Sequence, residues 1–305
     1  MWPGDALPQH GNTNWQVFYA TRSRGEPSTA GFQTYMKPPG ASMIYILMIA
    51  AGAGGSRVAD GNVTTAGGGG GSGGMSRMLI PAGLLPDIIY VSVGRGGLGA
   101  TTANTIGAAG ADSFVLMSRE NNSSSVILRQ NGAAQAASTQ AAGPGGVIGD
   151  PTSNSVFASL GLWFSIAGQA GTAGSATANA AATDITPGGS GIITTGGGGG
   201  ANGTGGTGDI TASGFFPAIS SNFFAGRIGH GFQKGAIISP GLKSFPLIFT
   251  GGGGGYGLFV SGNCANGGAA GYGGGGGGGG SGTNAGSISG NGGNGGDGLI
   301  IIGSL

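Results

Sequence analysis

The chain is 305 residues long, and 77 of these residues are glycine, about a quarter of the chain where about 7% is usual. Glycine and proline together reach about 30%, a range in which disorder is the default expectation. However, only 7% of the residues are charged and 38% are hydrophobic, whereas disordered segments are rich in charge and poor in aliphatic side chains. The composition therefore predicts an ordered protein whose core contains few bulky side chains.

Charge and hydropathy exclude two classes of partner. The formal net charge of +1 gives no field that would attract nucleic acid or an anionic membrane. The most apolar stretches, 43–53 and 156–167, are shorter than the roughly 20 residues of a membrane helix, so no membrane insertion is expected. The N-terminus lacks the basic and apolar regions of a secretory signal, and the single cysteine, Cys264, is interpreted as a small buried residue.

Short segments rich in β-branched and aromatic residues, bounded by Gly, Pro, Asn or Asp, predict β-strands. In chain order these are 15–20, 43–50, 75–80, 88–93, 113–117, 125–128 and 299–302. The continuous apolar run 44–49 predicts burial of both faces of its strand. The alanine-rich segment 133–142 is compatible with one short helix that ends at the following Gly-Pro-Gly-Gly. The fold class expected is all-β, with little or no α-helix.

The glycines occur in runs, at 67–71, 196–200, 251–255 and 273–280. Their irregular spacing excludes collagen and a fixed-period solenoid. Ordering each glycine costs roughly 0.5–1 kcal/mol more than ordering alanine. The runs are therefore expected at positions where any side chain would clash with neighbouring atoms. Polyglycine II helices, extended with three residues per turn, meet this condition because they can pack side by side and hydrogen-bond through their backbones. We therefore expect a sandwich-like body of short strands with polyglycine II helices.

Motifs of catalysis and cofactor binding have the wrong context. The sequence 94–99 matches G-x-G-x-x-G, but no helix follows that could hold a pyrophosphate. The sequence 70–74 places Ser72 in a nucleophile-elbow pattern without a strand-to-helix turn or a histidine in a triad context. We therefore predict no catalytic residue and no cofactor.

Metal-ligand spacing is also missing. The two histidines, one cysteine and ten carboxylates show no zinc or EF-hand pattern, so no metal site is predicted. Asp112, Asp209 and Asp297 are interpreted as turn residues that bond their own backbone. The chain is not expected to be an enzyme, although carboxylates that converge in space from distant positions would keep a hydrolase open.

Aromatic side chains gather in two blocks, 156–164 and 214–250. One interpretation is a satellite core beneath a loop; the other is a contact surface for another subunit or a receptor, because aromatic and arginine residues are the usual anchors of interfaces. The candidate contact residues are Phe157, Trp163, Phe164, Phe215, Phe216, Phe223, Phe224, Arg227, His230 and Phe232.

The order of several motifs suggests a family. The segment 35–55 contains, in order, an aromatic residue, Pro-Gly, an apolar strand and a glycine cluster. After it come a glycine run, a second strand and a Val-Gly-x-Gly-Gly motif that ends the strand at 91–97. The chain closes with a segment at 292–302 that passes from glycine to aliphatic residues. This succession resembles the glycine-rich domain of tail and fibre proteins of tailed bacteriophages, over 35–117 and the last fifteen or so residues. Pro81-Ala82-Gly83 replaces a direct Pro-Gly, and 120–290 holds long segments that the simple domain lacks. Those segments are similar in plan to the variable parts of polyglycine-helix phage adhesins, in which a lattice displays receptor-binding loops.

The resemblance implies a non-enzymatic virion structural protein, part of a tail fibre or spike, with a host surface receptor as a candidate partner. It would be made in the host cytoplasm and located in the virion. A capsid decoration or minor head protein, and a cellular glycine-rich surface or filament protein, remain alternatives. We expect an N-terminal arm, 1–34, that attaches to other virion proteins, and a body, 35–305, with variable insertions around 120–190 and 209–250. Low charge leaves apolar surface that predicts a homo-oligomer, a trimer by the resemblance.

Overall fold

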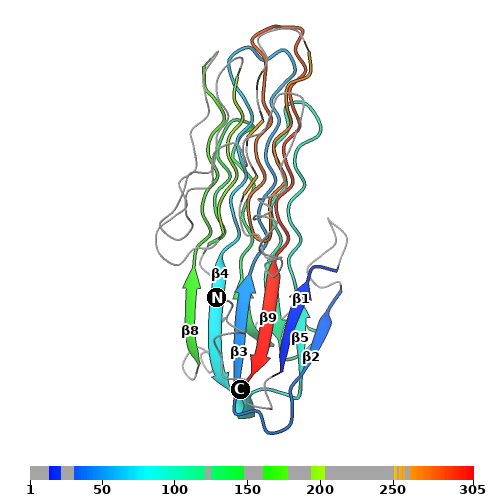
Figure 1. Ribbon diagram of the computed structural model, residues 1–305, viewed down its shortest axis with the longest axis vertical. Coiled ribbons are helices and arrows are strands. Elements are labelled where there is room, and N and C mark those ends of the chain that lie inside the picture. The colour runs from blue at the N-terminus through cyan, green and yellow to red at the C-terminus, as the bar shows by residue number, and fades with distance from the viewer. Residues whose placement is uncertain are drawn as a thin grey trace, which may run out of the picture.

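A computed structural model describes residues 14–21, 31–120, 125–147, 161–177, 194–202, 251–252, 254–255, 257 and 262–305. The β-strands lie together at one end of the molecule, and long extended segments continue from them toward the other end (Figure 1). The described part is all-β, with two antiparallel sheets and one short 3-10 helix, η1 (Ala82–Leu84).

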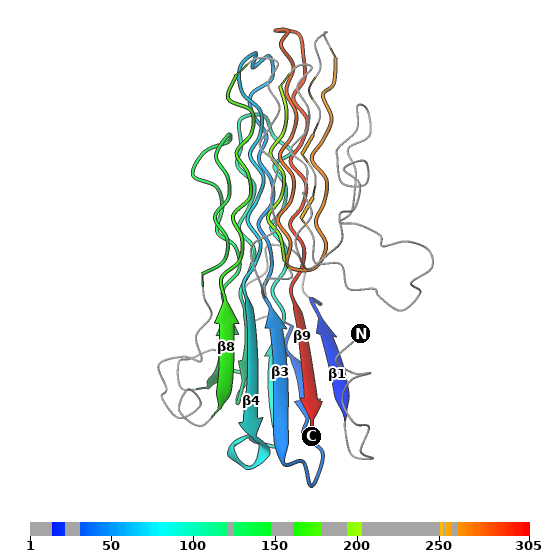
Figure 2. The ribbon, with the colours of Figure 1, turned by 60° about the vertical axis from the view of Figure 1, so that its left-hand side comes forward.

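The larger sheet has the strand order β1-β9-β3-β4-β8, which Figure 2 shows side by side. Its strands, all antiparallel to their neighbours, are β1 (Trp15–Tyr19), β9 (Leu299–Ser304), β3 (Met43–Ile49), β4 (Met75–Pro81) and β8 (Leu162–Ile166). Among the described strands, the last, β9, thus lies between β1 and β3, so the sheet joins the two ends of the described chain.

The smaller sheet has the order β2-β5-β6-β7. Its strands are β2 (Gln33–Met36), β5 (Ile88–Ser92), β6 (Ser113–Leu116) and β7 (Val126–Gln130). A register shift between Val115 and Leu116 interrupts the pairing of β6 with β7.

A side-chain core fills the space between the two sheets. Alternate residues of β3, such as Ile44 and Ile46, pack with Ile89 and Val91 of β5 and with Ile127 of β7, all almost fully buried. Burial of each such side chain stabilises the fold by roughly 1.5–3 kcal/mol. The sandwich therefore has an ordinary hydrophobic core. This core holds the strands in register and so sets the positions at which the glycine-rich segments begin.

All seven strands expected from the sequence are present, with bounds within two residues of those predicted. β2 and β8 were not predicted as strands. The short helix considered for 133–142 is wrong: this segment is extended with bends, and Ala133 donates its N–H to Ala51 O at 3.0 Å. Burial of both faces of 44–49 is also wrong, because Tyr45 and Leu47, on the side that faces away from the smaller sheet, are only partly buried.

Above the sheets, extended glycine-rich segments form a bundle held by main-chain hydrogen bonds (Figures 1 and 2). β3, β5, β7 and β8 each continue into one segment, and β4, β6 and β9 each follow one. The described segments are 50–57, 66–74, 94–100, 107–112, 131–133, 139–146, 168–175, 194–202, 251–252, 254–255, 264–270, 273–281 and 288–298.

The hydrogen bonds repeat every third residue, as expected for polyglycine II. Gly67, Gly70 and Gly73 donate to Gly279, Gly276 and Gly273 at 2.8, 2.7 and 2.8 Å. The residues between them donate elsewhere: Gly69 and Ser72 bond the carbonyl groups of segment 168–175. A helix with three residues per turn directs every third N–H toward the same neighbour, so the predicted polyglycine II helices are present.

Segment 50–57 lies inside this lattice. Its N–H groups donate to segments 66–74, 107–112 and 288–298. Its carbonyl groups accept from segments 94–100, 131–133 and 273–281. Neighbours on all sides therefore satisfy a buried backbone, which a chain with bulky side chains could not achieve at this spacing.

The missing Cβ atom is a requirement at most of these positions. A Cβ on Gly52 would lie 1.9 Å from Gly274 O, and a Cβ on Gly275 would lie 1.9 Å from Gly70 O. By contrast, a Cβ on Gly83, in η1, would meet nothing within 4 Å. Close packing of backbones thus explains why the sequence uses glycine in runs.

Candidate functional site: an apolar sheet face and a distal polar pocket

Two of the candidate contact residues lie in β8, the edge strand of the larger sheet. Trp163 pairs with Met78 and Phe164 with Arg77, and both aromatic side chains are exposed, at 39% and 47%. The others, Phe157, Phe215, Phe216, Phe223, Phe224, Arg227, His230 and Phe232, lie outside the described residues, and their role stays a prediction.

Phe164 belongs to a larger apolar surface, the side of the five-stranded sheet that faces away from the smaller sheet. We call this surface the outer face. Strand alternation and the pairing register place on it Trp15, Val17, Tyr19, Leu299, Ile301, Gly303, Tyr45, Leu47, Ile49, Met75, Arg77, Leu79, Leu162, Phe164 and Ile166. Arg77 is the charged member of this set.

Aromatic contacts organise the outer face. The Trp15 and Tyr45 rings meet edge to face at 5.8 Å between centroids, and the Arg77 guanidinium lies 5.1 Å from the centroid of the Phe164 ring. Burial raises the pKa of Tyr45, while the charge of Arg77 and a hydrogen bond with it act in the opposite direction. The positive charge therefore has partners within its own sheet.

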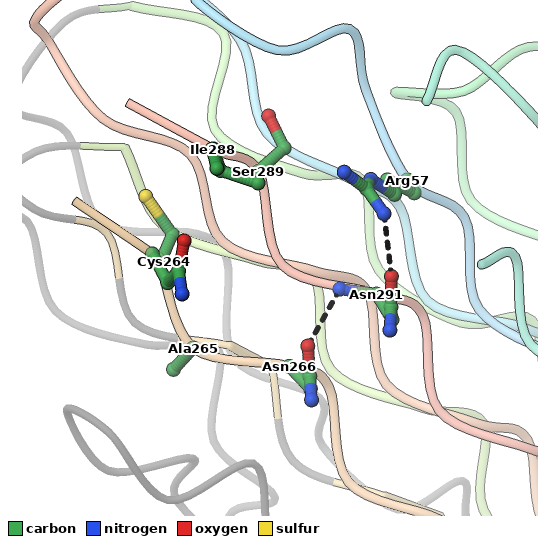
Figure 3. A pocket seen from close by; sticks show the side chains of 8 residues that line it. Arg57, Cys264, Ala265, Asn266, Ile288, Ser289 and Asn291 are labelled. Carbon is green, nitrogen blue, oxygen red and sulfur yellow. Dashed lines mark hydrogen bonds between the residues drawn. The ribbon is translucent and has the colours of Figure 1, made fainter. Parts of the chain in front are cut away.

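A second candidate surface is a polar pocket at the far end of the lattice. Segment 50–57 leads away from β3 and ends at Arg57, roughly 25 Å above the sheet at about 3.1 Å per residue. The pocket has a volume of about 470 Å³ and is lined by Arg57, Asn263, Cys264, Ala265, Asn266, Ile288, Ser289 and Asn291. Figure 3 shows that these residues come from neighbouring extended segments.

Hydrogen bonds fix the walls of the pocket. Arg57 Nη1 donates to Asn291 Oδ1 at 2.7 Å, and Asn291 N donates to Asn266 Oδ1 at 2.8 Å. Arg57 Nη2 donates to Asp60 Oδ1 at 2.8 Å, and this hydrogen bond is the largest cause that lowers the pKa of the Asp60 carboxyl. The pocket thus presents amide groups on a rigid base, a surface that suits a polar ligand with several hydroxyl or amide groups.

The motif at 94–99 is part of the lattice. Gly97 N donates to Gly52 O at 2.9 Å, and Gly96 N donates to Asp297 Oδ1 at 2.8 Å. Because these N–H groups already bond the chain itself, they are not directed at a ligand. Ser72, in the elbow-like pattern, is buried, and its Oγ accepts a hydrogen bond from Gln169 N at 2.7 Å.

The interpretation of Asp112 and Asp297 as turn residues bonding their own backbone is wrong. Asp297 bonds Gly96 N and forms an ion pair with Arg95 at 2.7 Å, across 202 residues of sequence. Asp112 accepts from Gly132 N at 2.9 Å and from Arg129 Nη2 at 2.6 Å. Both carboxylates therefore connect separate segments at the junction of sheet and lattice. Asp209 lies outside the described residues.

Three further features of the described residues concern metal binding, membrane spanning and the predicted N-terminal arm. They contain no group of three or more His, Cys, Asp or Glu side chains that could hold a metal ion. The helical part of this region is η1, which is far too short to cross a bilayer. Residues 15–19 of the predicted arm pair with β9 as an edge strand; attachment to other virion proteins stays a prediction.

Neither models of known protein families nor curated proteins match the sequence.

Sequence reasoning missed most of the outer face. Tyr45 and Leu47 were assigned to a strand buried on both sides, and Trp15 was assigned to the arm. The signal was present in the length of the apolar run 43–50, because a sandwich strand covered on one side needs apolar residues only at alternate positions.

Proposed function

We propose that the chain is a non-enzymatic structural protein of a bacteriophage particle, part of a tail fibre or spike, in which the polyglycine lattice holds a host-recognising surface away from the particle. The observation that supports this proposal most directly is the lattice itself. Its backbone hydrogen bonds repeat every third residue along segments that start at a conventional β-sandwich. Such a lattice is held together by its backbone and needs few side chains, so side chains at its far end can serve recognition.

The distal pocket is the described surface that fits host recognition. It lies at the end of the lattice opposite the sheets (Figure 1), and the exposed amide side chains of Asn263 and Asn266 line it. Receptors exposed on a cell offer hydroxyl, amide and carboxylate groups, which pair with such side chains. We therefore place receptor contact at this end and attachment to the particle at the sheet end.

A head decoration protein is the second candidate, and the apolar outer face is compatible with it. Such a face can pack laterally on a capsid as readily as on a fibre. Mass spectrometry and immunogold microscopy of purified particles distinguish the two: label on fibres or the tail tip supports the proposal, and label over the head supports the alternative. Absence of the chain from particles contradicts both.

Cell binding tests the placement of receptor contact. Asn263 is exposed at the pocket, so Asn263→Glu should weaken binding of the fluorescently labelled protein to host cells at least tenfold. Met36→Glu, at a position that is 70% exposed in β2, is the matched control and should bind as the wild type does. Equal binding by all three proteins would place the receptor contact elsewhere.

A further inference from the structure

We propose that copies of this chain associate through the outer face of the five-stranded sheet. The inference goes beyond the proposed function, because it concerns the sheet alone and holds for a fibre, a capsid or a cellular filament. The low charge of the sequence predicts a homo-oligomer without saying which surface forms the contact; the proposal assigns that contact to the outer face.

Exposure at the two margins of the face supports the proposal. In β8, Leu162 is 77% exposed; in β1, at the opposite edge, Tyr19 is 44% and Val17 is 38% exposed. Between these margins Tyr45, Leu47 and Leu79 are partly buried. Ile49, Met75, Leu299 and Ile301 are already buried within the chain, where Tyr272 packs against them. Exposed apolar side chains that gather on one surface mark interfaces in soluble proteins.

The size of the face fits a weak contact between copies. Five strands at about 4.8 Å spacing and seven residues at about 3.3 Å rise give a surface of roughly 20 by 23 Å. By this flat estimate two such faces in contact bury at most roughly 900 Å², and less where Ile49, Met75, Leu299 and Ile301 are already covered, which is the range of weak interfaces. Side chains that interdigitate bury more than this flat estimate.

Charge favours a second copy of the chain over a different, charged partner. Arg77 is paired with the Phe164 ring and with Tyr45 in its own sheet, so the face needs no carboxylate from its partner. The formal net charge of +1 adds no appreciable repulsion between copies. A partner with an acidic or basic surface would lose hydration on this face without finding a counter-charge.

Symmetry fits the same surface. A two-fold axis parallel to the strands would bring the outer faces of two copies together with both lattices pointing in one direction. The distal pockets then lie on the same side of the assembly. In that arrangement the assembly presents two pockets at once.

Light scattering after size-exclusion chromatography tests the proposal on the full chain. The wild type should be a homo-oligomer at micromolar concentration, and Leu162→Glu should raise its dissociation constant at least tenfold. Met36→Glu introduces the same charge at a similarly exposed position of the other sheet and should assemble as the wild type does. Circular dichroism verifies that each variant keeps the wild-type spectrum.

Val17→Glu, at the other margin of the face, provides a second test should Leu162→Glu fail to fold. A monomeric wild type would overturn the proposal, because some other part of the chain would then cover the face or leave it open. Assembly of Leu162→Glu or Val17→Glu with wild-type affinity would also overturn it. Neither result affects the virion assignment, which depends on finding the chain in particles.

Discussion

Replacing Gly52 by alanine tests whether the lattice depends on absent side chains. The added Cβ would lie 1.9 Å from Gly274 O and 3.0 Å from Gly273 O. Ordinary van der Waals contact begins at 3.4 Å, so segment 273–281 would have to retreat by about 1.5 Å. Both obstructing atoms belong to backbone inside the lattice, where no flexible side chain can move aside.

The displacement breaks specific hydrogen bonds. Gly274 O accepts from Gly296 N at 2.8 Å, and Gly276 N donates to Ala53 O at 2.9 Å. Each unsatisfied buried group costs about 1–3 kcal/mol, and overpacking alone costs about 1–3 kcal/mol. We expect Gly52→Ala to lower the free energy of unfolding by roughly 3–5 kcal/mol, a large part of an ordinary stability of about 5–15 kcal/mol.

Thermal unfolding followed by circular dichroism measures this effect. At roughly 2 °C per kcal/mol for a large domain, the melting temperature of Gly52→Ala should fall by about 6–10 °C. Gly83→Ala is the matched control, because its Cβ meets nothing within 4 Å; it should be neutral or stabilising by up to about 1 kcal/mol. Equal melting temperatures for the two variants would refute the reasoning from close backbone packing.

Two further predictions concern carboxylates that join separate segments. Asp297→Ala removes the partner of both Arg95 and Gly96 N and should lower the free energy of unfolding by about 2–4 kcal/mol, measured by denaturant titration; a loss below about 0.5 kcal/mol would contradict the role of this carboxylate. The hydrogen bond from Arg57 lowers the pKa of Asp60 below 3.8, so its contribution to stability is present above pH 3.8 and is lost as the pH falls through the lowered pKa. The melting temperature of the wild type should therefore fall more steeply with acid than that of Asp60→Asn, and parallel curves would argue against this contribution.

The strands could be predicted because their residues have strong local preferences. In 43–50 and 299–302, β-branched and aliphatic side chains leave few alternatives to a strand. The polyglycine segments could be predicted from energetics, since ordered glycine requires a place where only a missing side chain fits. By contrast, β2 carries Gln33 and Thr34 and has no clear alternation, so its strand depends on pairing with β5.

Long-range arrangement could not be predicted from local patterns. The position of β9 between β1 and β3 depends on contacts between the two ends of the chain. The bond from Gly96 to Asp297 likewise spans most of the sequence, and Asp297 in isolation has the pattern of a turn residue. The distal pocket was missed for the same reason, because Arg57, Asn266 and Asn291 come from three segments whose proximity the lattice alone determines.

Amide hydrogen exchange along 66–74 tests the central claim, that glycine runs form a hydrogen-bonded lattice, most directly. Gly67, Gly68, Gly69 and Gly70 each donate to a main-chain carbonyl group, although none has a side chain to pack. Their amides should exchange as slowly as those of β3, because opening any one requires opening the lattice. Exchange at the rate of an unfolded chain, with β3 still protected, would show that the runs are disordered and would contradict the account.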